Sequence, residues 1–404
     1  MGLPGLARVA YNLALWPFAW LARLLLRRSP KRWVFAGCGG TRFADNAAWF
    51  YLWTAENRPD LHPVWLTRDR SIAAGLRRAG LRAALEWSPR GLAAAARAGI
   101  AILSHGPSDL YYPAASGALI ANLWHGLPIK HIMNDHPADL AKARPTSLAG
   151  RLMQAIQRPG LRRGPDVVYG MTQPGAERVA AAARLRPEQA SGAGSPRLQA
   201  LTAVPPRWPF ERDLADLAGL VGQRAGPVVL FLPTWGTDPA LRDALLGPEL
   251  LHWLDRVDGV LIAKPHPNDP PLARAPHWTD RLQVAPRSLD ATLLMARADV
   301  LVTDISSAML DMLAAGRPVV LMRLAWTEDR GYYQRPEEFV DGAVVGDGAG
   351  FAKALQAAWL LRRKGRGNAS KAAAPWLPGD IEASSPQVLA DLLKRIPRRP
   401  RRLG

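Results

Sequence analysis

Residues 300–322 read VLVTDISSAMLDMLAAGRPVVLM, and this stretch decides the fold. A short run rich in β-branched residues, Val300–Thr303, is followed by helix-type spacing over Ser306–Ala315 and then by a second apolar run, Val319–Met322. The pattern predicts a strand, a helix and a strand, which is the repeating unit of a parallel sheet covered by helices.

The same rhythm extends over most of the chain. Further strands are predicted at Trp33–Ala36, His62–Leu66, Ile100–Ser104, Ala118–Trp124, Val228–Leu232 and Val260–Lys264. Further helices are predicted from about Asn46 and over Ile72–Ala79, Ala240–Leu254, Leu289–Ala296 and Phe351–Arg363. The stretch 184–210, rich in Pro, Gly, Ser and Ala, indicates a boundary between two halves. We therefore expect two doubly wound, Rossmann-like domains with a crevice between them, where ligands bind beyond the carboxyl ends of the strands.

Composition excludes several classes of protein. The 404 residues are 48% hydrophobic and 21% charged, which is typical of a globular chain and not of a disordered one. Cys38 is the single cysteine, so a disulfide framework and a cysteine-based zinc cluster are excluded, and a reducing compartment is favoured.

The net charge of +18 is concentrated at the two ends of the chain. Residues 1–32 and the last eleven residues carry six basic side chains each and no acidic one, so they supply 12 of the 18 excess charges. Aromatic residues do not alternate with these basic runs, so we expect no nucleic-acid partner.

The N-terminal segment Leu3–Leu26 is apolar and aromatic and is followed by a basic cluster. Fourteen uncharged residues lie between Arg8 and Arg23, whereas a spanning helix needs about twenty. No small-residue cleavage site of a secretory signal follows. These features predict an amphipathic helix lying in the plane of an anionic membrane surface, with the basic C-terminal tail as a second anchor. A first helix packed on the protein's own core is the alternative.

Four polar clusters directly follow predicted strands. The first contains His125, between Trp124 and Gly126. We expect this loop histidine to be exposed, to titrate near neutral pH and to take a proton from a hydroxyl group. A histidine that caps a backbone carbonyl is the alternative.

The other three clusters contain groups that suit phosphates. Lys264 and His266 form a cationic pair held by prolines, and Thr234 follows another strand. Ser306 and Ser307 stand at a helix start, where free backbone N–H groups favour an anion. Rigid turns and plain N-capping are the alternatives for these residues.

Asp311 lies one helical turn beyond Ser307, where its carboxylate could accept from ribose hydroxyls or be an ordinary helix residue. The chain contains no Gly-x-x-x-x-Gly-Lys loop, no Gly-x-Gly-x-x-Gly fingerprint, no Gly-x-Ser-x-Gly elbow, no Asp-x-Asp pair and no His-Glu-x-x-His motif. We therefore expect a crevice that binds a pyrophosphate through His, Lys and helix N-termini, without a metal.

Taken in order, these clusters resemble the motifs of the CDP-glycerol glycerophosphotransferase family, which includes the teichoic acid primases and polymerases. The family's Trp-His-Gly-Thr-Pro-Leu-Lys motif is matched at Trp124–Lys130, with Leu127 in place of Thr. The family's Pro-Thr-Trp-Arg motif is matched at Pro233–Trp235, with Gly236 in place of Arg, and its Thr-Asp-Tyr-Ser-Ser motif is matched at Thr303–Ser307, with Ile305 in place of Tyr. Three further motifs also match: Lys-x-His-Pro at Lys264–Pro267, Gly-x-Pro-Arg at Gly194–Arg197, and Asp-Asn at Asp45-Asn46. The usual Asn-Asp after Arg197 is Leu198-Gln199 here. The resemblance covers about residues 33 to 345.

The resemblance implies a GT-B fold. Residues 31–210 would form the N-terminal, acceptor domain and residues 211–375 the C-terminal, nucleotide-donor domain. A membrane-association segment, 1–30, and a C-terminal helix with a basic tail, 376–404, would flank them. The implied reaction moves a glycerol-phosphate or related polyol-phosphate unit from a CDP-linked donor to a hydroxyl of a lipid-linked or polyanionic acceptor, with release of CMP. It would need no cofactor or metal and would take place at the cytoplasmic face of the cell membrane.

The resemblance also implies roles for single residues. The catalytic residues would be His125 and His266. The donor phosphates and nucleotide would be held by Lys264, Thr234, Ser306, Ser307, Asp311 and Arg197. The acceptor side would be formed by Gly126, Lys130, Asp45 and Asn46.

Three questions stay open at the level of sequence: the donor alcohol, the acceptor, and whether one unit or a chain is added. A GT-B glycosyltransferase that uses a nucleotide sugar is the alternative enzyme. A membrane-surface scaffold or nucleic-acid binder is the alternative outside enzymes.

Overall fold

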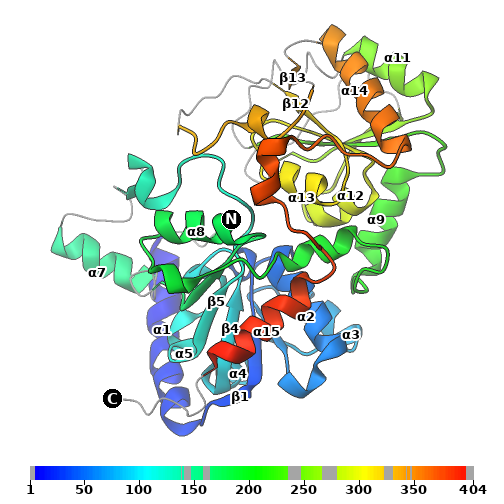
Figure 1. Cartoon of the computed structure of the whole chain (residues 1–404). Coiled ribbons are helices and arrows are strands. Elements are labelled where there is room, and N and C mark those ends of the chain that lie inside the picture. Colours follow the sequence, from blue (N-terminus) through cyan, green and yellow to red (C-terminus); the bar gives the residue numbers. More distant parts are fainter. Residues whose placement is uncertain are drawn as a thin grey trace.

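Two parallel sheets organise the chain (Figure 1). The computed structural model describes residues 5–137, 139–140, 147–157, 164–234, 247–265, 280–322, 331–342, 344–345 and 348–396. Within these residues the first sheet has the order β3-β2-β1-β4-β5-β6-β7 and the second the order β10-β9-β8-β11-β12-β13, and the paired strands are parallel. The prediction of an α/β fold with two parallel sheets is confirmed.

The first sheet carries the N-terminal half of the chain. Its strands are β1 (Ser29–Phe35), β2 (Val64–Thr67), β3 (Ala83–Leu85), β4 (Ala98–Leu103), β5 (Leu119–Asn122), β6 (Val167–Tyr169) and β7 (Ala190–Ser191). Its α-helices are α1 (Gly5–Leu25), α2 (Asp45–Asn57), α3 (Arg70–Arg78), α4 (Pro89–Arg97), α5 (Tyr112–Ala115), α7 (Leu148–Gln157) and α8 (Gln173–Ala182). Short 3₁₀ helices lie at η1 (Cys38–Gly40), η2 (Pro59–Leu61), η3 (Pro107–Asp109), η4 (Met133–Asp135), η5 (Pro187–Gln189) and η6 (Pro196–Leu201).

The second sheet carries the C-terminal half. Its strands are β8 (Val228–Leu232), β9 (Val260–Ala263), β10 (Leu282–Val284), β11 (Val300–Thr303), β12 (Val319–Met322) and β13 (Val344–Val345). The accompanying helices are α9 (Glu211–Val221), α11 (Pro248–Arg256), α12 (Ala291–Arg297), α13 (Ala308–Ala314), η7 (Pro336–Glu338), α14 (Gly348–Arg363), η8 (Lys371–Trp376) and α15 (Ser384–Arg395).

The apolar runs that the sequence analysis assigned to strands are strands because helices cover both faces of each sheet. Every residue of β8, β9, β11 and β12 is buried, so apolar side chains occupy successive positions and do not alternate with polar ones. The short strands β3, β6, β7 and β10 were not predicted. Strands β3 (Ala83–Leu85) and β7 (Ala190–Ser191) illustrate why such strands escape prediction. Their residues have little β propensity of their own, and pairing with a neighbouring strand holds them in place.

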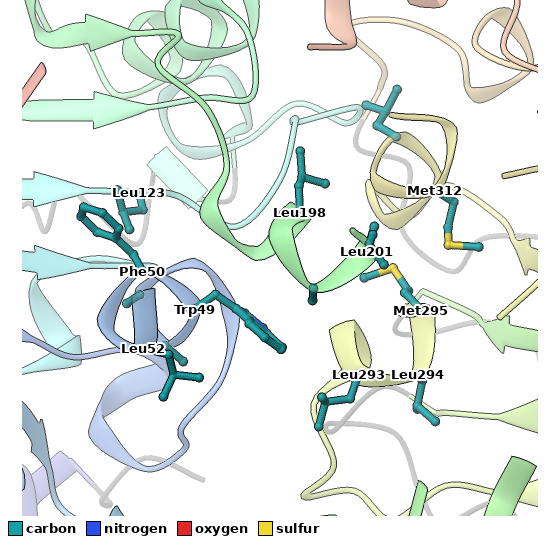
Figure 2. Close-up of a cluster of buried hydrophobic side chains, with 14 of the residues drawn as sticks. Trp49, Phe50, Leu52, Leu123, Leu198, Leu201, Leu293, Leu294, Met295 and Met312 are labelled. Atoms are coloured by element: carbon teal, nitrogen blue, oxygen red, sulfur yellow. The ribbon is translucent and has the colours of Figure 1, made fainter. Parts of the chain in front are cut away.

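The stretch interpreted as a boundary, 184–210, has structure of its own. It contributes β7 to the edge of the first sheet, and η6 packs between α2 and α12. Figure 2 shows Leu198 and Leu201 of η6 between Trp49 of α2 and Leu293 of α12 in one hydrophobic cluster. The two domains therefore share a buried apolar core at η6.

The C-terminal helix α15 returns to the first sheet (Figure 1). Tyr169 of β6 donates a hydrogen bond to Asp391, and Ser385 donates one to Gln199 of η6. The first and the last described helices, α1 and α15, therefore both lie on the first domain, and α15 packs against η6.

Helix α1 packs on the protein with one face and leaves its other face exposed. One face is packed, with Asn12 and Ala19 buried and the Asn12 side chain bonded to the carbonyls of Ile156 and Gln157 at the end of α7. The other face leaves large apolar side chains between 47% and 67% exposed, namely Leu13, Trp16, Phe18, Trp20, Leu21, Leu24 and Leu25. Among the described residues, no helix has the length and apolar character needed to cross a membrane.

Candidate active site

The carboxyl ends of strands from the two sheets come together at the domain interface. From the first sheet, β4 leads into His105 and β5 leads into His125. From the second sheet, β8, β9 and β11 lead into Thr234, Lys264 and the Ser306–Ser307 pair. Contacts cross the interface at this edge, as in the hydrogen bond from the Asp45 amide to Asp290 Oδ2 at 3.1 Å. This is the position at which open α/β sheets bind ligands.

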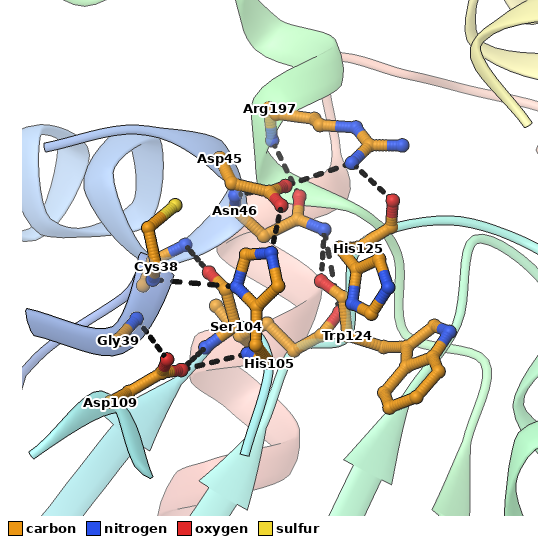
Figure 3. Close-up of polar contacts among 12 residues, drawn as sticks. Cys38, Gly39, Asp45, Asn46, Ser104, His105, Asp109, Trp124, His125 and Arg197 are labelled. Carbon is orange, nitrogen blue, oxygen red and sulfur yellow. Dashed lines mark hydrogen bonds and ion pairs between the residues drawn. The ribbon is translucent and has the colours of Figure 1, made fainter. Parts of the chain in front are cut away.

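Asn46 ties three segments of the first domain together (Figure 3). Its Nδ2 donates to the Trp124 carbonyl at 2.8 Å, and its Oδ1 accepts from the Ser195 hydroxyl and the Arg197 amide, both at 2.9 Å. The side chain is buried with both ends satisfied. Asn46 therefore sets the position of the His125 loop relative to η6.

Arg197 is a buried cation held between two carboxylates, one from each domain. Its guanidinium lies 2.8 Å from Asp45 Oδ1 and 2.8 Å from Asp311 Oδ2, and it donates to the His125 carbonyl at 2.7 Å. Asp311, on α13, is 1% exposed. Removing one member of such a buried arrangement leaves an uncompensated charge, which is strongly destabilising.

The two carboxylates have opposite pKa shifts. Burial acts to raise the pKa of Asp45, but Arg197, His105 and His125 together hold it below its ordinary value. Burial raises the pKa of Asp311 to about 6, against the opposing effect of Arg197. The structure therefore places Asp311 against Arg197 and not on an open surface where ribose hydroxyls could reach it.

The imidazole of His125 is partly buried, which corrects the expectation of an exposed ring that titrates near neutral pH. The rings of His105 and Trp124 lie 4.5 Å and 4.4 Å from it, and Nδ1 is buried without a hydrogen-bond partner. Burial lowers the pKa of His125 to about 3, with His105 and Arg197 acting in the same direction and Asp45 against them. The ring is therefore neutral at pH 7 and able to accept a proton.

His105 is the residue of this site that sequence reasoning missed. Its ring is stacked on that of His125, with 10° between the planes, and its Nε2 lies 3.7 Å from Asp45 Oδ2. The available signal was its place directly after the predicted strand Ile100–Ser104, since the other clusters were found by that criterion.

Gly126 lets the two domains approach each other next to His125. Its φ is +138°, which favours glycine, and a Cβ placed on it would lie 2.2 Å from Ser307 Oγ. Ser307 therefore lies directly against the His125 loop. Its side chain makes no capping hydrogen bond to α13, whereas the Ser306 hydroxyl accepts from the Ala308 amide at 3.3 Å.

The other predicted donor residues lie along the same edge of the second sheet. Both the amide and the hydroxyl of Thr234 donate to the buried carboxylate of Asp304. Lys264 is buried, and its Nζ donates to the carbonyls of Pro286 and Arg287 at 3.0 and 3.1 Å. Burial lowers the pKa of Lys264 to about 8, so this ammonium is still largely protonated at neutral pH.

The structure brings Asp45, Asn46, His125, Gly126, Arg197, Ser307 and Asp311 into one cluster. Lys130 lies outside it and pairs with Tyr332 in an isolated antiparallel bridge between the domains. His266, Trp235 and Gly236 lie outside the described residues. Among the residues that are described, no group of three or more His, Cys, Asp or Glu side chains is arranged to hold a metal ion.

Comparison with known families and structures relates this site to an enzyme class. A family model described as CDP-Glycerol:Poly(glycerophosphate) glycerophosphotransferase matches residues 20–370. The structure of the wall teichoic acid polymerase TagF is similar over 98% of both chains, at 17% sequence identity and a TM-score of 0.68. A variant of TagF soaked with CDPG is similar over 98% of both chains, at 18% identity and a TM-score of 0.67. At these identities the structures show a shared GT-B fold. A sequence search among curated proteins finds no match.

Proposed function

Because the chain belongs to the CDP-glycerol:poly(glycerophosphate) glycerophosphotransferase family, we propose that it transfers glycerol phosphate from CDP-glycerol to a hydroxyl group of a cell-surface polymer or its lipid-linked precursor. The observation that carries this proposal is the neutral, partly buried imidazole of His125, stacked on His105 and beside Asp45, at the carboxyl edges of both sheets.

The chemistry is an in-line phosphoryl transfer. The acceptor hydroxyl oxygen attacks the phosphorus that bears glycerol, and the bond from that phosphorus to the bridging oxygen breaks. The hydroxyl proton passes to His125, and CMP leaves with the bridging oxygen and its electron pair. Positioning and charge stabilisation supply most of the catalysis in such a reaction. Asp45 stabilises the imidazolium that forms, because its carboxylate is the anion that opposes the lowered pKa of His125.

The donor is proposed to bind on the second sheet. Lys264, Thr234, Ser306 and Ser307 follow neighbouring strands of that sheet, and Ser307 brings this edge to within contact distance of the His125 loop. His266 follows Lys264 after one proline and is proposed to share the phosphate-binding role. Two phosphates bound there would raise the pKa of His125, since negative charge favours the imidazolium. The base would thus become stronger only when the donor is present.

The acceptor side is proposed to face a membrane. Helix α1 packs beside α7, whose Leu148 and Leu152 are also exposed, at 83% and 63% (Figure 1). Arg27, Lys31 and Arg32 follow α1 directly and suit anionic headgroups. We place the enzyme peripherally on the cytoplasmic membrane face, where a lipid-linked or polyanionic acceptor would be within reach.

The test is a donor screen read by the nucleotide released. Purified protein is offered CDP-glycerol, CDP-ribitol or a mixture of UDP-sugars, with a lipid-linked acceptor and with or without EDTA. We expect CMP release with CDP-glycerol, unchanged by EDTA, and loss of at least 100-fold in His125→Ala. The exposed residue His252 on α11 supplies the control variant His252→Ala. UDP release without CMP release would instead identify a glycosyltransferase, and inhibition by EDTA would overturn the proposal of a metal-free reaction.

A further inference from the structure

Two imidazoles from neighbouring strands are stacked in this site (Figure 3). His105 follows β4 and His125 follows β5, and these strands pair in parallel. The ring centroids are 4.5 Å apart and the planes differ by 10°. One face of the proposed base is therefore covered by a second titratable ring.

The contacts of His105 define which of its nitrogens carries the proton. Nδ1 accepts a hydrogen bond from the Cys38 amide at 3.4 Å, so it carries no proton. In the neutral ring the proton is then on Nε2, which lies 3.7 Å from Asp45 Oδ2. This orientation directs an N–H group of His105 toward the carboxylate that also stabilises a positive charge on His125.

The backbone around His105 is held by a fully buried carboxylate. Asp109 Oδ2 accepts from the amides of Ser104, His105 and Gly106, at 3.1, 2.7 and 3.2 Å. Its Oδ1 accepts from the Gly39 amide at 2.8 Å, which joins this loop to the segment that contains Cys38. The ring of His105 is thus fixed by groups outside the cluster around His125.

We infer that His105 is a positioning residue for His125, one that holds the plane of the base against its stacked ring and competes with it for the negative charge of Asp45. This inference rests on the proposed function, because it assigns His125 as the base. His105 need not touch the substrate to act in this way. The sequence alone assigned no role to His105.

The charged groups around His125 give the stacked pair its effect. Within the first domain, Asp45 and Arg197 face His125. From the second domain, Asp311 contacts Arg197, and Asp290 accepts a hydrogen bond from the Asp45 amide. A proton on His105 opposes a proton on His125, and both compete for Asp45. The neighbouring ring of His105 therefore lowers the proton affinity of His125, which stays available as a base.

Two variants separate the shape of His105 from its charge. His105→Ala removes the ring, whereas His105→Phe keeps a flat ring for stacking and cannot take a proton. We expect His105→Ala to lower kcat at least 20-fold while the KM for CDP-glycerol changes less than threefold. His105→Phe should recover at least fivefold of that loss. In both variants the acid limb of the kcat profile should move to higher pH, because His125 no longer has a competitor. His252→Ala is the control, since it removes an exposed histidine outside the site.

An NMR titration of ¹⁵N-histidine-labelled protein without substrate provides a second measurement. We expect His105 to show the Nε2–H tautomer, and His125 to titrate at higher pH in His105→Phe than in the wild type. If that shift occurs while the wild-type protein releases no CMP, the proposed function fails and the imidazole pair stands. An unchanged titration of His125, or a His105→Ala variant whose kcat and pH profile match the wild type, overturns the inference.

Discussion

The contact between Gly126 and Ser307 can be tested by adding one methyl group. In Gly126→Ala the new Cβ would lie 2.2 Å from Ser307 Oγ, 2.9 Å from Ser307 Cβ and 3.2 Å from Arg197 Nη2. The hydroxyl can rotate away, but the approach to Cβ forces the backbone of α13 or of the His125 loop to move. Such overpacking costs about 1–3 kcal/mol, and the positive φ adds roughly 1–2 kcal/mol for a residue with a side chain. We expect a total destabilisation of about 3 kcal/mol.

The assay is urea unfolding followed by tryptophan fluorescence. At a slope of about 2–3 kcal/mol per molar urea, the expected loss lowers the midpoint by about 1–1.5 M. Gly342→Ala is the matched control, because Gly342 also has a positive φ, +103°, but no atom lies within 4 Å of its Cβ position. Gly342→Ala should lose only the part of the stability that depends on the positive φ, because its methyl group meets no other atom.

The double variant Gly126→Ala/Ser307→Gly isolates the contact. It removes both Ser307 atoms, Oγ and Cβ, from the clash, so the urea midpoint should recover about half of the decrease seen in Gly126→Ala. Ser307→Gly alone should cost only a few tenths of a kcal/mol, since glycine is tolerated at N-caps and the serine side chain caps nothing here. If the double variant is no more stable than Gly126→Ala, the reasoning is refuted, because the domains would not meet at this point.

Three further predictions concern other parts of the network and the membrane face. Burial raises the pKa of Asp311 in the folded protein to about 6, above its unfolded value, so the free energy of unfolding should fall as the pH rises from about 4 to 6. In Asp311→Asn the urea midpoint should depend less on pH across this range. Replacing both Trp16 and Trp20 on the exposed face of α1 by Ser should weaken co-sedimentation with anionic vesicles at least tenfold, whereas unchanged binding would place the attachment elsewhere. The buried carboxylate of Glu86 accepts hydrogen bonds from the Tyr11 hydroxyl of α1 and from Arg68, which in turn donates to the Gly39 carbonyl. Glu86→Gln should therefore speed both proteolysis within α1 and thiol labelling of Cys38. Rates equal to those of the wild type would contradict this connection.

The sheet architecture could be predicted because parallel strands are buried on both faces. Their apolar runs, such as Val228–Leu232 and Val300–Thr303, carry the signal within four or five residues. The edge of the sheet that carries the candidate site followed from the same pattern, and His125 was located by it. Strands as short as Ala190–Ser191 carry no such signal, because pairing with β6 creates them.

The environment of each site residue could not be predicted, because it depends on contacts between distant segments. His125 was expected to be exposed because it lies on a loop, yet His105, from the neighbouring strand, covers its ring, and Ser307 of the other domain lies against Gly126. The sequence places His105 and His125 twenty positions apart. The adjacency of β4 and β5 makes them stack.

Asp45 and Asp311 show how far the fold decides the chemistry of identical side chains. Both are carboxylates that contact the same guanidinium at 2.8 Å, and both are desolvated. Asp45 also faces two imidazoles and accepts an amide hydrogen bond from Asn46, so its anionic form is favoured. Asp311 has Arg197 as its one stabilising charge and feels the negative charge of Asp45, so burial prevails and its pKa rises to about 6. One cation shared by two buried acids cannot fully neutralise both, and as the pH falls the acid on the side of the imidazoles is the one that keeps its charge longer. That asymmetry keeps the negative charge beside His125, which is where the proposed reaction needs the transferred proton to be received.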